Sequence, residues 1–411
     1  MGYREPIFAL DIGTSKICAI LCEQGDGGLR VIGVGVSPAY GLKEGNISSL
    51  EEVSRSISVA VNSTEQMSGI RAEDVYIGVN GSHLDGVDNL GMITLPRSSR
   101  GVTQGDIKRV IEAAKTFNLP EENVVVDILA QEFIIDGQSG VRNPLGMGGK
   151  RLEVVIYIVT CKRSFAVNIK RAVEKEGYSY ARLVPIPVAL SDLLIKPGEK
   201  DMGSVLIDIG GFETTAVIYI DNKIANMFTV PLGAEHLTRD LSIGLRIAPE
   251  EAEELKLSYG CVHKSVLEEK EIEVMGVGGR SERKVSTERV FDILEARMEE
   301  IYRMILVNMN KNGFGGYLAG GVVLTGGGAN INGAVELAED VFNLNTKIGT
   351  LEGIEWISGF DDDPSYHASI AIASYVMRHR MESDSILEMG RYRGFFRGVG
   401  EWFKGLFSLG D

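Results

Sequence analysis

The sequence predicts a mixed α/β fold built from two similar halves, and three glycine-containing segments support this prediction. An apolar run, the triplet Asp-Ile-Gly, hydroxyl residues and a second apolar run occur in this order near the N-terminus and again in mid-chain. Each copy is typical of a β-hairpin, because two apolar runs separated by a short glycine-containing turn favour antiparallel pairing. Residues 320–342 form the third segment, which is typical of a buried strand, a flexible loop and a helix.

The first hairpin is expected to pair residues 7–12 with residues 17–21. Because glycine has no Cβ, backbone N–H groups around its turn can approach an anion closely and form a cradle for phosphate oxygens. An aspartate at the end of the strand can hold a hydrated Mg²⁺, which needs only one or two carboxylates. The hydroxyls are further donors and the lysine adds positive charge. The candidate residues are therefore Asp11, Gly13, Thr14, Ser15 and Lys16.

The second hairpin is expected to pair residues 205–209 with residues 216–220, and it repeats the same chemistry. A single Asp-x-Gly-Thr turn would be weak evidence, because Asp-Gly turns commonly join strands without any ligand. Two copies in equivalent contexts instead favour a two-sided phosphate clamp. The candidates here are Asp208, Gly210, Gly211, Thr214 and Thr215, and Asp208 joins Asp11 as a candidate metal ligand.

The third segment contains Gly326, Gly327 and Gly328, where backbone amides could lie against a nucleotide. Taken alone, it could equally be an ordinary strand-to-helix turn of an α/β domain. The order of the three segments resembles the actin and heat-shock-chaperone ATPase superfamily, as do two helices with small residues at 187–194 and 368–376. This resemblance implies an actin-like two-lobed fold of duplicated ribonuclease-H-like domains, a hinge at the two helices, and ATP with Mg²⁺ as the ligand.

Composition agrees with a large soluble protein. The chain has 411 residues with 44% hydrophobic content, so it can bury a sizeable core, and it has no run of 18 apolar residues. Its net charge of −15 argues against nucleic acid as a partner, because neutralising phosphates needs clustered Lys and Arg. Since the N-terminus lacks a signal-peptide core, the protein is expected to stay in the cytoplasm. The four cysteines and five histidines fit no metal-binding spacing.

The C-terminal segment differs from this acidic body. Residues 391–411 contain four basic and two acidic side chains, and apolar residues recur every three or four positions from 392 to 407. Such a stripe, with a basic opposite face, predicts an amphipathic helix that lies in the interface of an anionic membrane. A helix docked on the protein's own core is the alternative, but residues 381–390 are typical of a polar tether. The candidate membrane residues are Phe395, Phe396, Arg397, Val399, Trp402, Phe403, Lys404, Leu406 and Phe407.

The chain resembles the bacterial cell-division family FtsA over essentially its full length. The resemblance rests on the Asn-Pro, Gly-Met-x-Gly and Arg-Leu-Glu elements within residues 141–153, on residues 131–136, and on the C-terminal amphipathic helix. In this family one actin subdomain is replaced by a differently placed insertion. Within that insertion, the sequence predicts a strand at 91–95, a helix from Thr103 to Phe117 with Thr103 as its N-cap, and a buried strand at 154–161.

The resemblance implies a division of the chain into actin-like parts, insertions and a tail. The first actin-like subdomain comprises residues 1–83 and 164–196, and the inserted subdomain comprises 84–163. The second actin-like subdomain comprises 197–228 and 304–380, with a further insertion at 229–303. A linker at 381–390 leads to the membrane helix at 391–411.

The insertion at 229–303 contains two further candidate sites. A helix is expected to start at Pro249, with Glu253 and Lys256 on one face. In the superfamily a Glu and a Lys so placed reach the ribose and base, whereas an ordinary solvated ion pair is the alternative. Residues 278–284 are typical of a basic loop, and by resemblance this subdomain receives the C-terminal peptide of the tubulin-like division protein FtsZ. An acidic peptide would suit the basic side chains of Arg280, Arg283 and Lys284, although solvated loop charges are the alternative.

Two departures from the superfamily pattern affect catalysis. Enzymes of this type that turn over use a Glu or Gln to orient the attacking water, and Ile186 stands at the aligned position. Phe212 replaces a glycine of the second phosphate hairpin, so this turn could be narrowed or reshaped. Since positioning and charge stabilisation are most of what a protein contributes to phosphoryl transfer, ATP hydrolysis is expected to be slow or absent.

The expected function is that of an actin-like, ATP-binding cell-division protein. By resemblance it would polymerise, tether FtsZ filaments to the cytoplasmic face of the membrane at the division septum, and recruit later division proteins, with ATP acting as a switch. Its expected partners are the FtsZ peptide, a second copy of itself, anionic membrane lipid and other division proteins. A PilM-like pilus scaffold and a metabolite kinase are the alternatives, and the amphipathic C-terminus disfavours both.

Overall fold

The structure, a computed structural model, describes residues 5–96, 101–276 and 282–388. The chain forms two compact units. Among the described residues, unit 1 comprises those within 5–86, 121–127 and 159–373, and unit 2 those within 87–120, 128–158 and 374–388. Among the described helices, none is both long and apolar enough to cross a membrane.

The first lobe of unit 1 contains a six-stranded sheet with the order β11-β6-β1-β2-β3-β19. Strands β1, β2 and β3 are antiparallel, whereas β6 lies parallel to β1 on its other side. Helices α1 and α3 pack on this sheet, and their apolar faces share its core. The elements are β1 (Ile7–Ile12), β2 (Lys16–Gln24), β3 (Leu29–Pro38), β4 (Leu42–Lys43), β5 (Asn46–Ile47), α1 (Leu50–Ser68), β6 (Asp74–Val79), η1 (Gly81–His83), α3 (Arg163–Lys175), β11 (Ser179–Pro185) and β19 (Ile354–Glu355).

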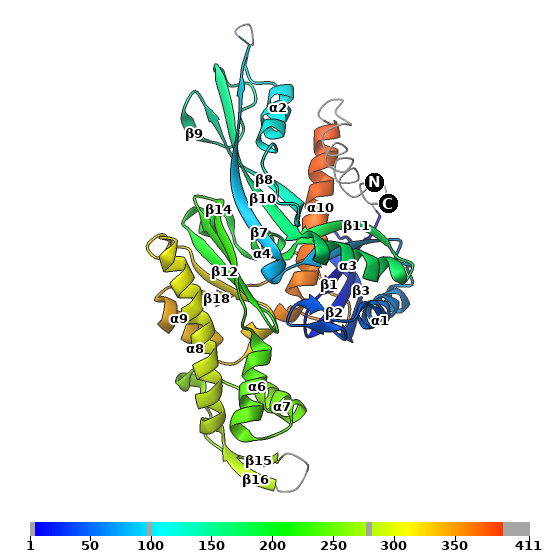
Figure 1. Ribbon diagram of the computed structural model, residues 1–411, viewed down its shortest axis with the longest axis vertical. Coiled ribbons are helices and arrows are strands. Elements are labelled where there is room, and N and C mark those ends of the chain that lie inside the picture. The colour runs from blue at the N-terminus through cyan, green and yellow to red at the C-terminus, as the bar shows by residue number, and fades with distance from the viewer. Residues whose placement is uncertain (1–4, 97–100, 277–281, 389–411) are drawn as a thin grey trace. The chain divides into compact units, whose positions relative to one another are not determined.

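The second lobe repeats this arrangement, with the strand order β14-β13-β12-β17-β18. Strands β14, β12 and β18 of this sheet are labelled in Figure 1. Again three antiparallel strands are followed by a parallel strand, because β12 pairs with β13 on one side and with β17 on the other. The predicted duplication is therefore confirmed at the level of topology. The elements are α4 (Ile186–Leu194), α5 (Pro197–Asp201), β12 (Ser204–Ile209), β13 (Thr214–Ile220), β14 (Lys223–Val230), β17 (Gly321–Thr325), η3 (Gly327–Asn330), α9 (Ala334–Phe342), β18 (Thr346–Ile348) and η4 (Pro364–Tyr366).

A helical region lies between β14 and β17 in the sequence. Helices α6, α7 and α8 contact one another and share one apolar core with the second sheet, including Leu241, Ala252 and Leu294. Helix α7 starts at Pro249 as predicted, because proline has the backbone angle of a first helical residue and lacks an N–H that would need a partner. The elements are α6 (Ala234–Leu245), α7 (Pro249–Tyr259), η2 (Lys264–Val266), β15 (Glu271–Met275), β16 (Glu282–Ser286) and α8 (Thr287–Lys311).

Unit 2 contains α2 and parts of a four-stranded sheet with the order β7-β10-β8-β9. Thr103 caps α2 as predicted: its Oγ1 accepts from the N–H of Asp106 over 3.2 Å, and Oδ2 of Asp106 accepts from the N–H of Thr103 over 2.9 Å. The helix ends at Ala114, earlier than predicted, in a sequence that continues through Thr, Asn and Pro. The elements are β7 (Leu84–Thr94), α2 (Gln104–Ala114), β8 (Asn123–Ile135), β9 (Gln138–Val141) and β10 (Arg151–Lys162).

Helix α10 (His367–Glu388) differs from the prediction. Its backbone remains helical through residues 381–388, for which the sequence predicts a polar tether. The physical reason is that this stretch has no glycine or proline and contains Met, Leu and Glu, all of which have high helix propensity. The segment 389–411, with all the candidate membrane residues, lies outside the described residues.

Candidate functional site

The two predicted phosphate hairpins have matching turns. Asp11 pairs with Cys18 across the first hairpin, and Asp208 pairs with Thr215 across the second. A Cβ added to Gly13 would lie 2.9 Å from the carbonyl oxygen of Lys16, and one added to Gly210 would lie 2.9 Å from that of Glu213. In both turns the glycine therefore lies against the carbonyl oxygen of the residue three positions later, where a side chain would force the backbone to move.

The two turns face each other. A Cβ on Gly211 would lie 2.3 Å from Oγ of Ser15 and 2.9 Å from Oγ1 of Thr14, so the hydroxyls of the first turn contact the second. The hydroxyl of Ser15 also donates to Oε1 of Glu235, over 3.0 Å. Glu235 lies in the first turn of α6, and its own N–H donates to the carbonyl of Gly211 over 2.8 Å. The start of α6 thus belongs to the site.

The two aspartates are electrostatically strained. Burial raises the pKa of Asp11 to about 7, with the charge of Asp208 adding to the rise and Lys16 opposing it. Burial also raises the pKa of Asp208 to about 6, against a hydrogen bond from Asn80. A divalent cation would neutralise this pair, so the residues fit the implied Mg²⁺. Within the described ranges, no group of three or more His, Cys, Asp or Glu side chains could hold a metal ion.

The third glycine segment packs against the end of β12. Gly326 has a φ of +84°, and a Cβ there would lie 2.4 Å from Oδ1 of Asp208. A Cβ on Gly328 would lie 2.4 Å from Cγ2 of Ile209. Gly327 and Gly328 are the first two residues of η3, a short helix that precedes α9. The structure therefore brings the third segment to the second hairpin, as the superfamily resemblance implies.

Lys16 has partners that sequence reasoning missed. Its Nζ donates to Oγ of Ser365 over 2.9 Å and lies 4.2 Å from the ring centre of Tyr366. Oδ1 of Asp363 in turn accepts from the N–H of Ser365, over 2.7 Å, and from Nδ2 of Asn330, over 2.9 Å. Lys16 is thereby connected to the third glycine segment. The sequence carries no recognisable signal for these contacts, because each joins residues far apart in the chain.

Glu253 and Lys256 form an ion pair that contacts Thr238 of α6. Nζ of Lys256 is 2.6 Å from Oε2 of Glu253, and it donates to Oγ1 of Thr238 over 2.8 Å. The hydroxyl of Thr238 also donates to Glu253. Thr238 follows Glu235 by one turn of α6, and the Lys256 side chain is only 11% exposed. The Lys256 side chain is therefore built into the α6–α7 contact, whereas the Glu253 side chain is 39% exposed.

Thr214 requires a correction. Its side chain is fully buried, and its hydroxyl donates to the carbonyl of Leu232 over 2.8 Å. Successive side chains of a strand point to opposite faces, so Thr214 faces away from Thr215 and Asp208. Of the two threonines, Thr215 lies on the face of the site.

Phe212 has an edge-on contact with His236 of α6, with ring centres 5.9 Å apart.

Ile186 lies in an apolar contact between helices. It is 2% exposed, and a Cβ on Gly78 would lie 2.7 Å from its Cδ1 and 2.4 Å from Cδ1 of Ile372. Helices α4 and α10 therefore meet beside β6, as expected of the two hinge helices. A buried aliphatic side chain offers no hydrogen bond to water at this position.

The basic segment near residue 280 also requires a correction. Arg283 and Lys284 lie on β16 of a two-stranded hairpin, not in a loop, and are paired in register with Val274 and Glu273. The partner strand β15 alternates charged and apolar residues, which is typical of a strand, and β16 pairs with it along its full length. Nζ of Lys284 is 3.4 Å from Oε2 of Glu271, so part of its charge is compensated. Arg280 lies outside the described residues.

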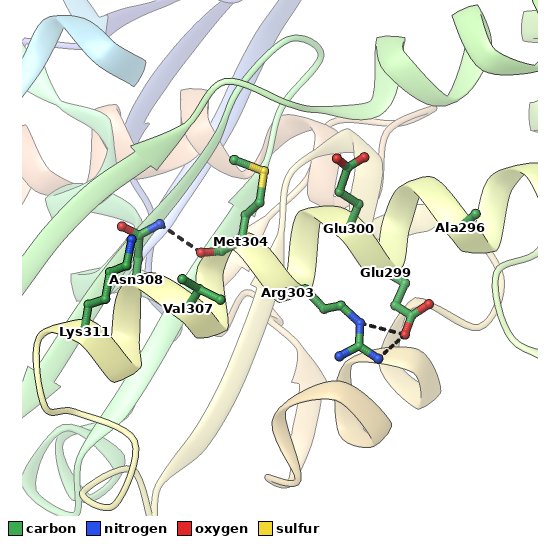
Figure 2. A pocket seen from close by; sticks show the side chains of 8 residues that line it. All are labelled: Ala296, Glu299, Glu300, Arg303, Met304, Val307, Asn308 and Lys311. Carbon is green, nitrogen blue, oxygen red and sulfur yellow. Dashed lines mark hydrogen bonds and ion pairs between the residues drawn. The ribbon is translucent and has the colours of Figure 1, made fainter.

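A separate depression of about 420 Å³ runs along α8 (Figure 2). Figure 2 shows Arg303 directed toward Glu299, with which it forms an ion pair along the same helix. The lining residues all come from α8, not from the hairpins: Ala296, Glu299, Glu300, Arg303, Met304, Val307, Asn308 and Lys311. This open surface offers no phosphate cradle.

Comparison with protein families and curated sequences gives consistent matches. Residues 205–371 match the family described as cell division protein FtsA, and residues 81–160 match the SHS2 domain inserted in FtsA. The chain is 32% identical to cell division protein FtsA of Pseudomonas aeruginosa over 386 residues, which cover 93% of this chain and 92% of that protein. It is 33% identical to cell division protein FtsA of Bacillus subtilis over 382 residues, or 92% of this chain and 85% of that protein.

Comparison with solved structures supports the fold. The PilM–PilN type IV pilus biogenesis complex matches with a TM-score of 0.64 at 15% identity, covering 90% of this chain and 98% of that one. MreB5 of Spiroplasma citri bound to ADP matches with a TM-score of 0.58 at 15% identity, covering 94% and 99%. These likenesses show an actin-like fold, and the pilus scaffold is a neighbour in structure only. With its duplicated lobes and its curated relatives, the chain belongs to the FtsA family of actin-like cell division proteins.

Proposed function

We propose that this cell-division protein binds ATP with Mg²⁺ and serves as a membrane adaptor for FtsZ filaments. The observation that carries the nucleotide part is the pair of matching hairpin turns that face each other, with an aspartate at each strand end. A solved neighbour of the same fold, MreB5, is described as bound to ADP. That description supports the same ligand class for this chain.

Each part of the site has a proposed role. Asp11 and Asp208 would hold the hydrated cation, and the N–H groups of both glycine turns would bind phosphate oxygens. Lys16 would release its hydrogen bond to Ser365 and donate to a phosphate oxygen instead. The loop of Gly326 to Gly328 would lie against the nucleoside. Glu253 and Lys256 would reach the ribose and base from α7. ATP bound between the two lobes would bias their closure about α4 and α10.

The nucleotide would act mainly as a switch. Ile186 is buried and cannot orient water, and no other side chain is assigned to that task. Typical kinases turn over about 1–100 times per second, and we expect ATP turnover by this protein to be far slower. Sustained phosphate release within that range would instead favour the metabolite-kinase alternative.

The α6–α8 region is the proposed site for the FtsZ peptide. Arg283 on β16 is exposed, and Met275 at the end of β15 is 48% exposed, so a cation and an apolar side chain are both accessible on this hairpin. An acidic peptide with apolar residues would complement them. Self-assembly into filaments and contacts with other division proteins are further proposals that rest on the family.

The C-terminal segment is the proposed membrane anchor. Its aromatic stripe and basic face would place the protein on the cytoplasmic face of the cytoplasmic membrane at the division site. A PilM-like pilus scaffold is not expected to carry an amphipathic anchor of its own. This difference favours the adaptor.

Calorimetric titration of ATP in the presence of Mg²⁺ tests the nucleotide site. We expect Asp11→Ala and Asp208→Ala to abolish binding, because each removes a carboxylate from the proposed metal site. Asp74→Ala is the matched control, since Asp74 is an exposed aspartate at the start of β6. Parent-like affinity in both site variants would refute the two-hairpin assignment, provided that circular dichroism shows all variants folded.

A further inference from the structure

Asn80 lies at the end of β6, beside the first hairpin. Strand β6, which ends at Val79 just before Asn80, is parallel to β1, and Gly78 is paired in register with Asp11. The backbone of Asn80 is extended, and Oδ1 accepts a hydrogen bond of 2.8 Å from the N–H of Gly81, the first residue of η1. Asn80 therefore belongs to the first lobe and is held there by its own local contact.

The same side chain has two partners in the second lobe. Nδ2 donates to Oδ2 of Asp208 over 2.7 Å, and Oδ1 accepts from Oγ1 of Thr215 over 3.1 Å. Asp208 and Thr215 are cross-strand partners, so their side chains lie on the same face of the sheet. These partners fix which way the Asn80 amide points. Its NH2 group must face the Asp208 carboxylate, which only accepts, and its oxygen must face the N–H of Gly81, which only donates.

A backbone contact joins the same two segments. The N–H of Ser82 donates to Oε2 of Glu213, in the turn of the second hairpin, over 3.1 Å. Gly81 has a φ of +78°, and a Cβ there would lie 1.9 Å from this oxygen. The glycine therefore lets Glu213 reach the backbone. Residues 80–82 thus bind two acidic side chains of the second lobe.

We propose that Asn80 is a positioning residue that clasps the two lobes and orients the Asp208 carboxylate. The amide holds one oxygen of Asp208 together with the hydroxyl of its cross-strand partner, so the direction of the carboxylate is fixed before a ligand arrives. The contacts of the clasp join residues of this chain alone. Its effect on Mg²⁺ rests on the proposed function.

Two substitutions separate the clasp from local effects. Asn80→Asp keeps an oxygen acceptor for Gly81 and Thr215 but places a second carboxylate against Asp208, so like-charge repulsion should open the contact. In the reciprocal pair, Asn80→Asp is combined with Asp208→Asn. The amide donor is then at position 208 and the carboxylate acceptor at position 80, so the hydrogen bond should form again. Asn312→Ala is the matched control, because it removes an amide that donates to Asn308 within its own helix end.

Hydrogen exchange of the ligand-free protein, followed by mass spectrometry, tests the clasp. We expect Asn80→Asp and Asn80→Ala to exchange faster in peptides covering residues 80–83 and 208–215. The reciprocal pair and Asn312→Ala should match the parent. Parent-like exchange in both single variants, or fast exchange in the reciprocal pair, overturns the clasp. If the single variants do not fold, recovery of folding in the reciprocal pair supports it and continued misfolding overturns it.

Calorimetry with ATP, with and without Mg²⁺, tests the orienting role. Asn80→Ala should weaken binding in Mg²⁺ by about tenfold, as expected for a lost hydrogen bond to a charged group, and leave binding without Mg²⁺ unchanged. The reciprocal pair should stay weak in Mg²⁺ because it lacks the Asp208 carboxylate. An equal loss with and without metal overturns the orienting role. If the parent itself does not bind ATP, the proposed function fails, whereas the exchange result still decides the clasp.

Discussion

At the scale of single residues, the two strand-end aspartates show how a binding site can oppose stability. Burial raises the energy of both carboxylates in their ionised form, the charge of Asp208 adds to the effect at Asp11, and Lys16 compensates only in part. Asn80 stabilises the ionised form of Asp208 by donating a hydrogen bond to it. The site is thus prepared for a cation, at the expense of the metal-free fold.

This strain predicts a pH dependence with a definite sign. Both carboxyls have folded-state pKa values, about 7 and about 6, above the ordinary value of 3.8. The native state therefore binds more protons than the unfolded state between these values, and metal-free stability should fall as pH rises from about 4 to about 7. Above that window the loss is complete.

Asp11→Asn should remove much of this loss. We expect the variant to match the parent near pH 4 and to melt several degrees higher near pH 8, since 1 kcal/mol corresponds to about 2–4 °C in larger domains. Thermal melts in a chelator across this pH range provide the measurement. Added Mg²⁺ with ATP should stabilise the parent but not the variant. Parallel pH curves for the two metal-free proteins would contradict the assignment.

At the scale of elements, the phosphate hairpins were predictable because their signal is local. Asp, Gly and the flanking apolar runs fix the turn wherever they occur, so both hairpins and the strand before Gly326 follow from the sequence. The contacts of Asn80 and Ser365 were not predictable, because they join segments that only the fold brings together. The sequence assigned both Thr214 and Thr215 to the site, because the motif alone does not show which of two successive side chains faces the ligand.

The loop at Gly326 allows an element-scale prediction. Gly326 has a positive φ, and an added Cβ would collide with Oδ1 of Asp208. Gly326→Ala should therefore cost about 1–3 kcal/mol of unfolding free energy and displace the carboxylate, lowering the affinity for ATP with Mg²⁺. Gly316→Ala is the matched control, because Gly316 is exposed and a Cβ there meets no atom within 4 Å.

Urea denaturation and calorimetry check this prediction together. A stable Gly326→Ala variant with parent-like affinity would mean that the third glycine segment does not constrain the second hairpin. Equal losses in Gly326→Ala and Gly316→Ala would point to a general cost of replacing loop glycines.

At the scale of the whole molecule, charge divides the chain. The protein carries a net charge of −15, yet residues 391–411 hold four basic and two acidic side chains. An acidic body is repelled by an anionic surface, so an anchor must combine apolar burial with local positive charge. The boundaries of the subdomains and this anchor remain predictions from the sequence.

The last prediction concerns this anchor. Each large apolar side chain contributes about 1.5–3 kcal/mol when fully buried, and each Lys or Arg near an anionic surface about 1 kcal/mol. The aromatic residues should therefore dominate, and Trp402→Glu with Phe403→Glu should release the protein from liposomes in a co-sedimentation assay. Tyr317→Glu is the control, because Tyr317 is a 63% exposed aromatic residue outside the tail.

The basic residues of the tail should add selectivity. Replacing Arg393, Arg397 and Lys404 with Gln should weaken binding to anionic vesicles more than binding to neutral ones, and salt should reduce this difference because it screens surface charge. If the double Glu variant sediments with liposomes like the parent, the aromatic stripe does not face lipid. The segment would then belong to the protein's own core, and the adaptor proposal would lose its anchor.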